Sequence, residues 1–208
     1  MQSLLTVTAA AASRDLVTLA TMKDELGVTG SATDARIGRW ITEASGQIDA
    51  YLDRTLAQET VTETFRWEGI ERRVDPVLLQ RYPVSAIASV TEDADTALDP
   101  DLYELDSATG RLWRLDAAGC RVRWQCSVRL VIAYTGGYAL PADVPAPIEI
   151  ACQRLVKQRW YGFGQDPNLR RTQTDGVGTD EWFAPTSGAP GLPAEITDLL
   201  DPFRRMIV

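Results

Sequence analysis

Residues 127–163 constrain the fold more than any other part of the chain, because they read as a strand, a tight turn and a helix in direct succession. From Val128 to Tyr134, apolar side chains recur at every second position, which is the period of a pleated strand with one buried face. Gly136–Gly137 follows, and glycine adopts positive φ without steric cost, so the strand can end abruptly. Pro145 and Pro147 suit a first helical turn, where φ near −65° is wanted and no backbone donor is needed.

The helix that follows is predicted over residues 147–161. Its main apolar stripe recurs at steps of three and four, at Ile148, Cys152 and Leu155. Val156 and Trp160 lie on the adjoining face, as expected of a helix that a neighbouring subunit also contacts.

Two further helices are predicted in the first third of the chain. Thr21-Met-Lys-Asp24 matches a capping box and Gly27 suits the left-handed residue after a helix, which together predict a helix over 21–27. A second capping pattern at Ser31-Ala-Thr-Asp34 precedes a longer helix over 34–56, in which apolar residues again follow helical spacing.

The longer helix is expected to pack against the helix 147–161, since both are amphipathic and neither is stable alone in water. Gly38 and Gly46 lie in its interior, where each glycine costs about 1 kcal/mol relative to alanine. Residues without side chains are tolerated best where another backbone approaches closely. The two glycines therefore predict a helix neighbour at these positions.

From Glu59 the apolar period changes from 3.6 to 2, and residues 59–135 are predicted to form a β region. After a first strand that runs to Trp67, five more candidates are separated by short turns: Val84–Thr91, Leu102–Leu105, Arg111–Leu115, Arg121–Cys126 and Val128–Tyr134. Their closeness in the chain favours antiparallel hairpins over βαβ crossovers. The fold class predicted from the residues is α+β.

Charge is spread unevenly through the β region. Residues 59–110 hold 12 acidic and 4 basic side chains, whereas residues 111–135 hold 5 basic and 1 acidic. One interpretation is an ordinary solvated surface with weak cross-strand ion pairs. The other is a polar molecule whose acidic side meets the basic side of a neighbouring copy, as a head-to-tail ring requires.

Residues 164–191 are rich in Gly, Pro, Ser, Thr and Asp and show no sustained period, which predicts an extended arm. Trp182 and Phe183 lie side by side in this arm, and large aromatic residues often anchor interfaces. A terminal helix is predicted over 193–207, with apolar residues at helical spacing and a kink at Pro202.

The sequence offers no recognisable catalytic machinery. The chain contains no histidine, its three cysteines have no metal-binding or disulfide spacing, and it has no phosphate-binding loop. Asp93, Asp95, Asp99 and Asp101 lack the glycine and the closing glutamate of a calcium loop. We therefore expect no enzyme, no cofactor, no metal and no membrane span, although paired-carboxylate catalysis by some of the 29 acidic residues stays open as an alternative.

The order of several short motifs resembles the head–tail connector (adaptor or head-completion) proteins of long-tailed bacteriophages, including their gene transfer agent counterpart. The motifs are Ile48–Leu52, Arg81–Val84, Tyr103–Asp106, Tyr134–Tyr138 and Val144–Ile148. The resemblance covers nearly the whole chain. The arm at 164–191 is longer than in the shorter members of the family.

The resemblance implies an α-helical body with an antiparallel β-hairpin insertion and an extended C-terminal arm that ends in a short helix. In this organisation residues 1–163 form the connector domain and residues 164–208 the arm. The implied function is structural: a ring, of twelve copies in the particle, that joins the portal protein to the stopper or tail-terminator protein in the virion neck. Double-stranded DNA passes through the lumen without specific binding, and assembly takes place in the bacterial cytoplasm.

Seven residues of the arm and terminal helix are predicted to bind the portal: Trp182, Phe183, Leu199, Phe203, Arg204, Arg205 and Ile207. The reasons are the length of the arm, its aromatic residues and a terminal helix without an evident local partner. The alternative is a soluble, non-enzymatic scaffold that binds a partner through the same arm.

Overall fold

The computed structural model describes residues 2–67, 73–74, 76–93, 97–125, 129–163, 171–174, 178–181 and 192–205. The chain divides into two compact units, each built from two separate stretches of sequence. Residues 1–14 and 54–143 form the β unit, and residues 15–53 and 144–208 form the helical unit. The α+β class expected from the sequence is confirmed, whereas the expected boundary between residues 163 and 164 remains a prediction.

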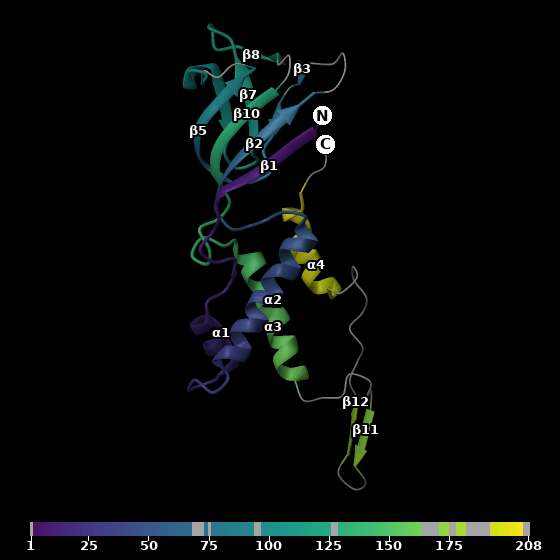
Figure 1. Ribbon diagram of the computed structural model, residues 1–208. Coiled ribbons are helices and arrows are strands. Elements are labelled where there is room, and N and C mark those ends of the chain that lie inside the picture. The colour runs from purple at the N-terminus through teal and green to yellow at the C-terminus, as the bar shows by residue number, and fades with distance from the viewer. Residues whose placement is uncertain are drawn as a thin grey trace. The chain divides into compact units, whose positions relative to one another are not determined.

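In the helical unit, α2 (Asp34–Leu52) and α3 (Ala146–Gly162) pack side by side, with α1 (Leu19–Leu26) against both (Figure 1). Their apolar stripes meet in a core that includes Ile41 and Leu155, which are 2% and 4% exposed. The expected pairing of the two long helices is therefore confirmed. α4 (Ala194–Leu200) contacts α3 and continues into the short 3₁₀ helix η2 (Asp201–Phe203).

The helix ends differ from those expected, for local reasons. The N-cap of α1 is Thr18, whose hydroxyl accepts a hydrogen bond from the Thr21 N–H at 3.0 Å, so this helix begins two residues before Thr21. α2 ends at Leu52 rather than at residue 56, because Asp53 adopts the left-handed conformation with φ +52°. α4 ends at Leu200, where Pro202 enters the 3₁₀ turn.

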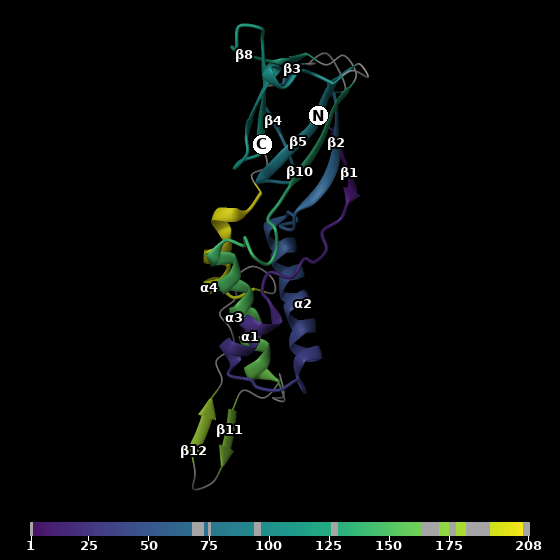
Figure 2. The same ribbon diagram turned by 90° about the vertical axis from the view of Figure 1, so that its left-hand side faces the viewer.

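The β unit contains two four-stranded antiparallel sheets that share one hydrophobic core (Figure 2). The first has the order β1-β2-β10-β5, formed by Gln2–Ala9, Glu59–Arg66, Arg129–Gly136 and Val84–Glu92. The second has the order β4-β7-β6, formed by Val77–Leu78, Arg111–Leu115 and Tyr103–Asp106, and β8 (Arg121–Val122) extends it from β7. Between them lie Phe65, Leu112 and the fully buried Trp124, whose indole N–H donates to the Leu112 carbonyl at 3.1 Å.

The remaining short elements are β3 (Arg73–Val74), which pairs with β9 (Trp124–Gln125), and the 3₁₀ helix η1 (Pro100–Leu102). The antiparallel hairpins expected for the β region are present. A strand was not expected at β1, and none was expected within the arm, where β11 (Arg171–Thr174) pairs with β12 (Gly178–Glu181).

Glycine ends β10 where three chain segments meet closely. Gly137 has φ +107°, and a Cβ atom there would lie 2.4 Å from the Ala57 carbonyl oxygen. A Cβ atom at the preceding residue, Gly136, would lie only 2.2 Å from the Arg81 carbonyl oxygen. The N–H of the following residue, Tyr138, donates to the Leu56 carbonyl at 2.7 Å. The abrupt strand end expected at Gly136–Gly137 is therefore confirmed.

The glycines of α2 are explained differently from the expectation. Among the described residues, a Cβ atom added at Gly38 or Gly46 would meet nothing within 4 Å outside its own helix. The prediction of a close helix neighbour at these positions is therefore wrong within the single chain.

Candidate interaction surfaces

The C-terminal residues predicted to bind the portal fall into two groups. Leu199, Phe203, Arg204 and Arg205 lie on α4 and in the segment after it, whereas Trp182, Phe183 and Ile207 lie outside the described residues. In the described group, Arg204 is exposed and the other three are partly buried.

α4 is held in place by its own chain, which supplies the partner that was not evident from the sequence. Its inner face buries Ile196, Thr197 and Leu200. The Tyr51 hydroxyl of α2 donates to the Asp201 carboxylate, and this hydrogen bond is the main reason that the pKa of Tyr51 is raised. The Arg205 N–H donates to the Leu52 carbonyl at 3.0 Å. The terminal helix is thus part of the helical unit.

A second candidate surface is an aromatic cluster between the first half of α2 and the end of α3. The Trp40 ring lies 6.3 Å from that of Trp160 and 5.8 Å from that of Phe163, between ring centroids. The Arg36 guanidinium lies 4.0 Å above the Phe163 ring. Phe163 and Tyr161 are 56% and 66% exposed. Trp, Tyr and Arg are the residues that most often dominate binding energy at interfaces.

Sequence reasoning noted only Trp160 in this cluster. Trp40 lies four residues after Arg36 on α2, and that spacing places them on one helix face. This spacing was the available signal, but the partner ring, Phe163, is 123 positions away and could not be paired with Trp40 from the sequence.

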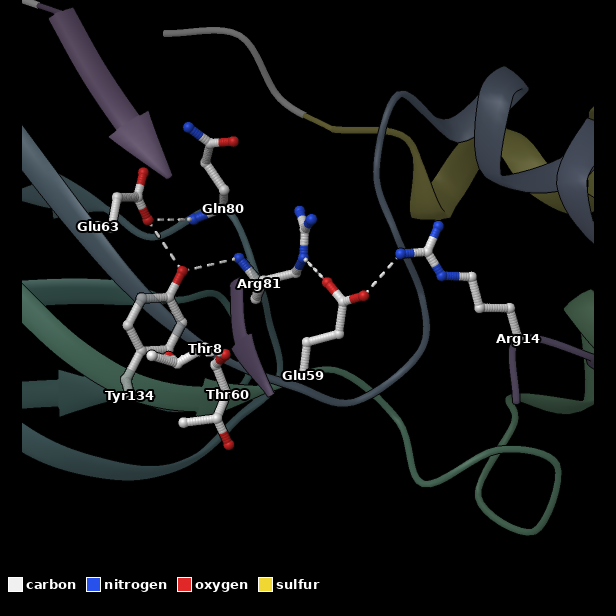
Figure 3. A network of polar contacts seen from close by, with 8 residues as sticks. All are labelled: Thr8, Arg14, Glu59, Thr60, Glu63, Gln80, Arg81 and Tyr134. Atoms are coloured by element: carbon white, nitrogen blue, oxygen red, sulfur yellow. Dashed lines mark hydrogen bonds and ion pairs between the residues drawn. The ribbon is translucent and has the colours of Figure 1, made fainter. Parts of the chain in front are cut away.

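In the β unit, polar side chains form a connected network at one end of the first sheet (Figure 3). The Glu59 carboxylate has no exposed side-chain surface and contacts two guanidinium groups, Arg14 at 2.7 Å and Arg81 at 3.0 Å. The opposite charge that a buried carboxylate needs nearby is therefore supplied by its own chain, through two guanidinium groups.

The same network continues through a buried tyrosine. The Tyr134 hydroxyl donates to Glu63 Oε2 at 2.9 Å and accepts from the Arg81 N–H at 3.0 Å, while the Gln80 N–H donates to the same Glu63 oxygen at 3.1 Å. Burial above all, and then the charge of Glu63, raise the pKa of Tyr134. The two buried carboxylates thus hold neighbouring strands and loops together, which is a structural use of these groups.

Two arginines of the basic stretch pair with acidic side chains of the acidic stretch. β7, from the basic stretch, lies between β4 and β6 of the acidic stretch. Arg114 of β7 contacts Glu92 at 3.1 Å, and Arg121 of β8 contacts Glu104 at 2.8 Å and lowers the pKa of that carboxyl. These contacts are the ion pairs of the first interpretation, and the head-to-tail interpretation stays a prediction.

The aspartates near residues 93–101 have structural partners where they are described. Asp93 Oδ1 accepts from the Arg129 N–H at 2.7 Å, and Asp99 Oδ1 accepts from the Asp101 N–H at 3.1 Å. Asp95 lies outside the described residues. Within the described part of the chain, no group of three or more potential ligands could hold a metal ion. No helix in that same part is long and apolar enough to cross a membrane.

Comparison with known families gives one match that covers most of the chain. The family model described as head completion protein matches residues 15–206. The matched range includes the helical unit up to residue 206 and residues 54–143 of the β unit. A search of curated proteins found no match.

Among solved structures, the chain resembles a protein in the neck of an empty gene transfer agent particle computed with C6 symmetry, with a TM-score of 0.59 and 17% identity over 99% of this chain and 97% of that one. A chain from the neck of the native particle, computed with C12 symmetry, gives a TM-score of 0.57 and 18% identity over the same shares. A chain from the virion of the native particle gives a TM-score of 0.52 and 18% identity, again over 99% of this chain and 97% of that one. These likenesses show a shared fold along the full length of the chain.

Proposed function

We propose, since this chain belongs to the head completion protein family, that it is a non-enzymatic structural protein in the neck of a phage or phage-like particle. The observation that carries the proposal is the family match over residues 15–206. The shared fold with neck chains over 99% of this chain supports it.

In this proposal the protein forms a ring of twelve copies that joins the portal of the DNA-filled head to the stopper or tail-terminator protein. The C6 and C12 symmetries belong to the related particles, and they motivate the same ring order here. The ring extends the DNA channel. A net charge of −8 suits such a channel, because DNA phosphates pass an acidic protein without the arrest that strong Lys or Arg contacts would cause.

The proposed portal contact uses the outer side of the C-terminal segment. Ile196 and Leu200 face the helical unit, whereas Leu199 and Phe203 are only partly buried and Arg204 is exposed. The buried side of α4 therefore maintains the fold, while Leu199 and the segment after α4 can bind a partner. Trp182, Phe183 and Ile207 belong to the same proposed contact on the evidence of their sequence positions. Twelve copies acting on one ring would strengthen a weak single contact considerably.

Imaging of the particle neck tests the proposal directly. We expect a ring between portal and tail whose density accommodates both units of this chain. A neck without this ring, in particles that nevertheless contain the protein, would contradict the proposal and favour a soluble scaffold.

The portal contact has its own test, because the two sides of α4 can be changed separately. Leu199→Asp combined with Arg204→Glu should leave the purified protein folded but reduce its binding to portal rings at least tenfold. Leu200→Asp is the matched control for the buried side and should instead destabilise the helical unit. Unchanged portal binding by the folded double variant would exclude this side of α4 from the contact.

A further inference from the structure

The two edges of the first sheet are protected to very different extents. At the β5 edge, loop residues occupy part of the outer main chain: the Leu98 N–H donates to the Val90 carbonyl at 2.7 Å, and the Val84 N–H donates to the Ser107 carbonyl at 2.8 Å. The pairing of β5 with β10 also has two register shifts. Loops and bulges are two of the devices by which proteins prevent unwanted strand pairing.

β1, at the opposite edge, has few of these devices. It pairs with β2 from Gln2 to Val7 without a register shift, and it contains no charged residue and no proline. Leu4 and Val7 are 64% and 41% exposed. Within the described part of the chain, no further strand pairs with its outer side (Figure 1). β1 is an uncharged edge strand of eight residues whose pairing with β2 is regular from Gln2 to Val7 and shifts register only between Val7 and Ala9, and such an edge is a template for another strand.

The solvent-facing side of this sheet is also uncharged over its central rows. The cross-strand rows read Leu4–Thr64–Val131–Thr91 and Thr6–Thr62–Ala133–Ser89. Charged residues make up 24% of the chain, yet none occurs in these two rows. The uncharged surface of these two rows is therefore continuous with the open β1 edge, whereas the row at Gln2 carries Arg66 and Arg129 on the neighbouring strands.

The same chain contains a strand pair that needs a neighbour. β11 and β12 are four residues each and form a separate two-stranded sheet. An isolated two-stranded hairpin is marginally stable in water, whereas a third strand gives it a sheet to extend. Among the described strands, β1 pairs with β2, and β11 pairs with β12.

We propose that β1 of one copy is extended by the β11–β12 hairpin of a second copy. Each copy carries one open edge and one hairpin, so a head-to-tail exchange repeated around a closed ring uses every edge and every hairpin. Direct pairing of two β1 strands would instead close a two-fold dimer and leave both hairpins without a sheet. The inference rests on the ring of the proposed function, because a ring provides the neighbour.

Disulfide trapping between two differently labelled copies tests the exchange. In a Cys120→Ser, Cys126→Ser background, one copy carries Thr6→Cys on β1 and the other carries Thr172→Cys on β11 or Thr179→Cys on β12. Particles assembled from the mixture are oxidised and separated by non-reducing electrophoresis. We expect a mixed disulfide between β1 and at least one hairpin strand, formed at least tenfold more than with the matched control Ala86→Cys on the β5 edge.

A second variant removes the proposed contact without introducing a thiol. Leu4→Lys places a charge on the open edge at an exposed position that the fold does not need, and should reduce the mixed disulfide at least tenfold. Leu4→Thr, which adds no charge, should leave it within twofold. Exchange of main-chain hydrogens in β1 should also slow at least tenfold when the free protein enters the assembled particle.

Three results would overturn the inference, provided that the neck ring is still visible in images. The first is a disulfide that forms only between two Thr6→Cys copies, and the second is one that forms only within a single chain carrying both cysteines. The third is the absence of any disulfide to either hairpin strand. Loss of the ring itself would instead contradict the proposed function. The two failures are therefore distinguishable.

Discussion

Replacement of Tyr134 by phenylalanine tests how much the buried polar network contributes to the β unit. The side chain is fully buried, and only its hydroxyl oxygen is removed. That oxygen donates to Glu63 Oε2 at 2.9 Å and accepts from the Arg81 N–H at 3.0 Å. The ring remains, so the substitution removes two hydrogen bonds without opening an appreciable cavity.

The expected loss at pH 7 is about 2–4 kcal/mol of unfolding free energy. A hydrogen bond to a charged group contributes about 1.5–3 kcal/mol, and a buried donor left without its acceptor costs about 1–3 kcal/mol. The two contributions overlap, because the Arg81 N–H and the Glu63 carboxylate can adjust after the hydroxyl is removed. The expected loss is therefore smaller than the sum of the two maximal contributions.

The difference in unfolding free energy between the wild-type protein and Tyr134→Phe should also depend on pH, and it should become smaller as the pH rises. Burial, followed by the charge of Glu63, raises the pKa of Tyr134 above its ordinary value of 10.0 in the folded protein. Above pH 10 the unfolded chain loses the phenolic proton while the folded chain keeps it, so the wild-type protein becomes less stable. The variant lacks this proton, and the difference in stability should narrow by up to about 1.4 kcal/mol per pH unit above pH 10.

Hydrogen exchange of peptides from β2 and β10, followed across a urea series, reports the stability of the β unit separately from the helical unit. Tyr161→Phe is the matched control: the side chain is 66% exposed, and the change should stay within about 0.5 kcal/mol. If the β2 and β10 peptides of Tyr134→Phe exchange their hydrogens at the same urea concentrations as those of the wild-type protein at pH 7, the network does not stabilise the sheet and the prediction is wrong.

Three other substitutions and one labelling experiment test the packing. Leu155→Asp should unfold the helical unit, because an unpaired carboxylate in this 4% exposed site costs several kcal/mol; circular dichroism that matches the parent would refute it. Gly137→Ala should cost about 3 kcal/mol or more in urea unfolding, owing to φ +107° and a carbonyl oxygen 2.4 Å from the new Cβ. Gly46→Ala, in open space on a helix, should instead gain about 0.5–1 kcal/mol, and a loss would show a hidden contact. Burial raises the pKa of the Cys152 thiol to about 12, so iodoacetamide at pH 8 should label it far more slowly than the exposed Cys120, as peptide mass spectrometry would show.

Elements with a strong period could be predicted from the sequence, and elements defined by distant partners could not. β10 and α3 follow periods of two and 3.6, and both lie within two residues of the expected bounds. In β2, Glu63 alternates with the same period of two as Val61 and Phe65, which is the pattern of the buried face on which it lies. β1 has apolar residues on both sides, so no single period marks it. The arm hairpin has strands of only four residues, too short for a period to emerge.

The candidate surfaces show the same limit. The terminal helix was expected, but its packing against α3 brings together residues more than 30 positions apart, and nothing local to α4 specifies that contact. The partners of Glu59 are Arg14 and Arg81, which lie 45 and 22 positions away in opposite directions along the chain. Such partners depend on the topology, which brings the strand β2 between two distant segments.

The way charge is arranged in the structure also bears on how copies would associate. Arg114 and Arg121 already contact acidic side chains of their own chain, so a neighbour could engage them only by competing with existing pairs. The Arg121–Glu104 pair is exposed, and surface pairs contribute about 1 kcal/mol or less and are screened by salt, whereas the Arg114–Glu92 pair is partly buried and screened less. Strand addition at β1 forms main-chain hydrogen bonds and covers Leu4 and Val7, and neither contribution depends on a charged partner. Association through the β1 edge should therefore persist at salt concentrations that abolish association through the arginine-rich strands.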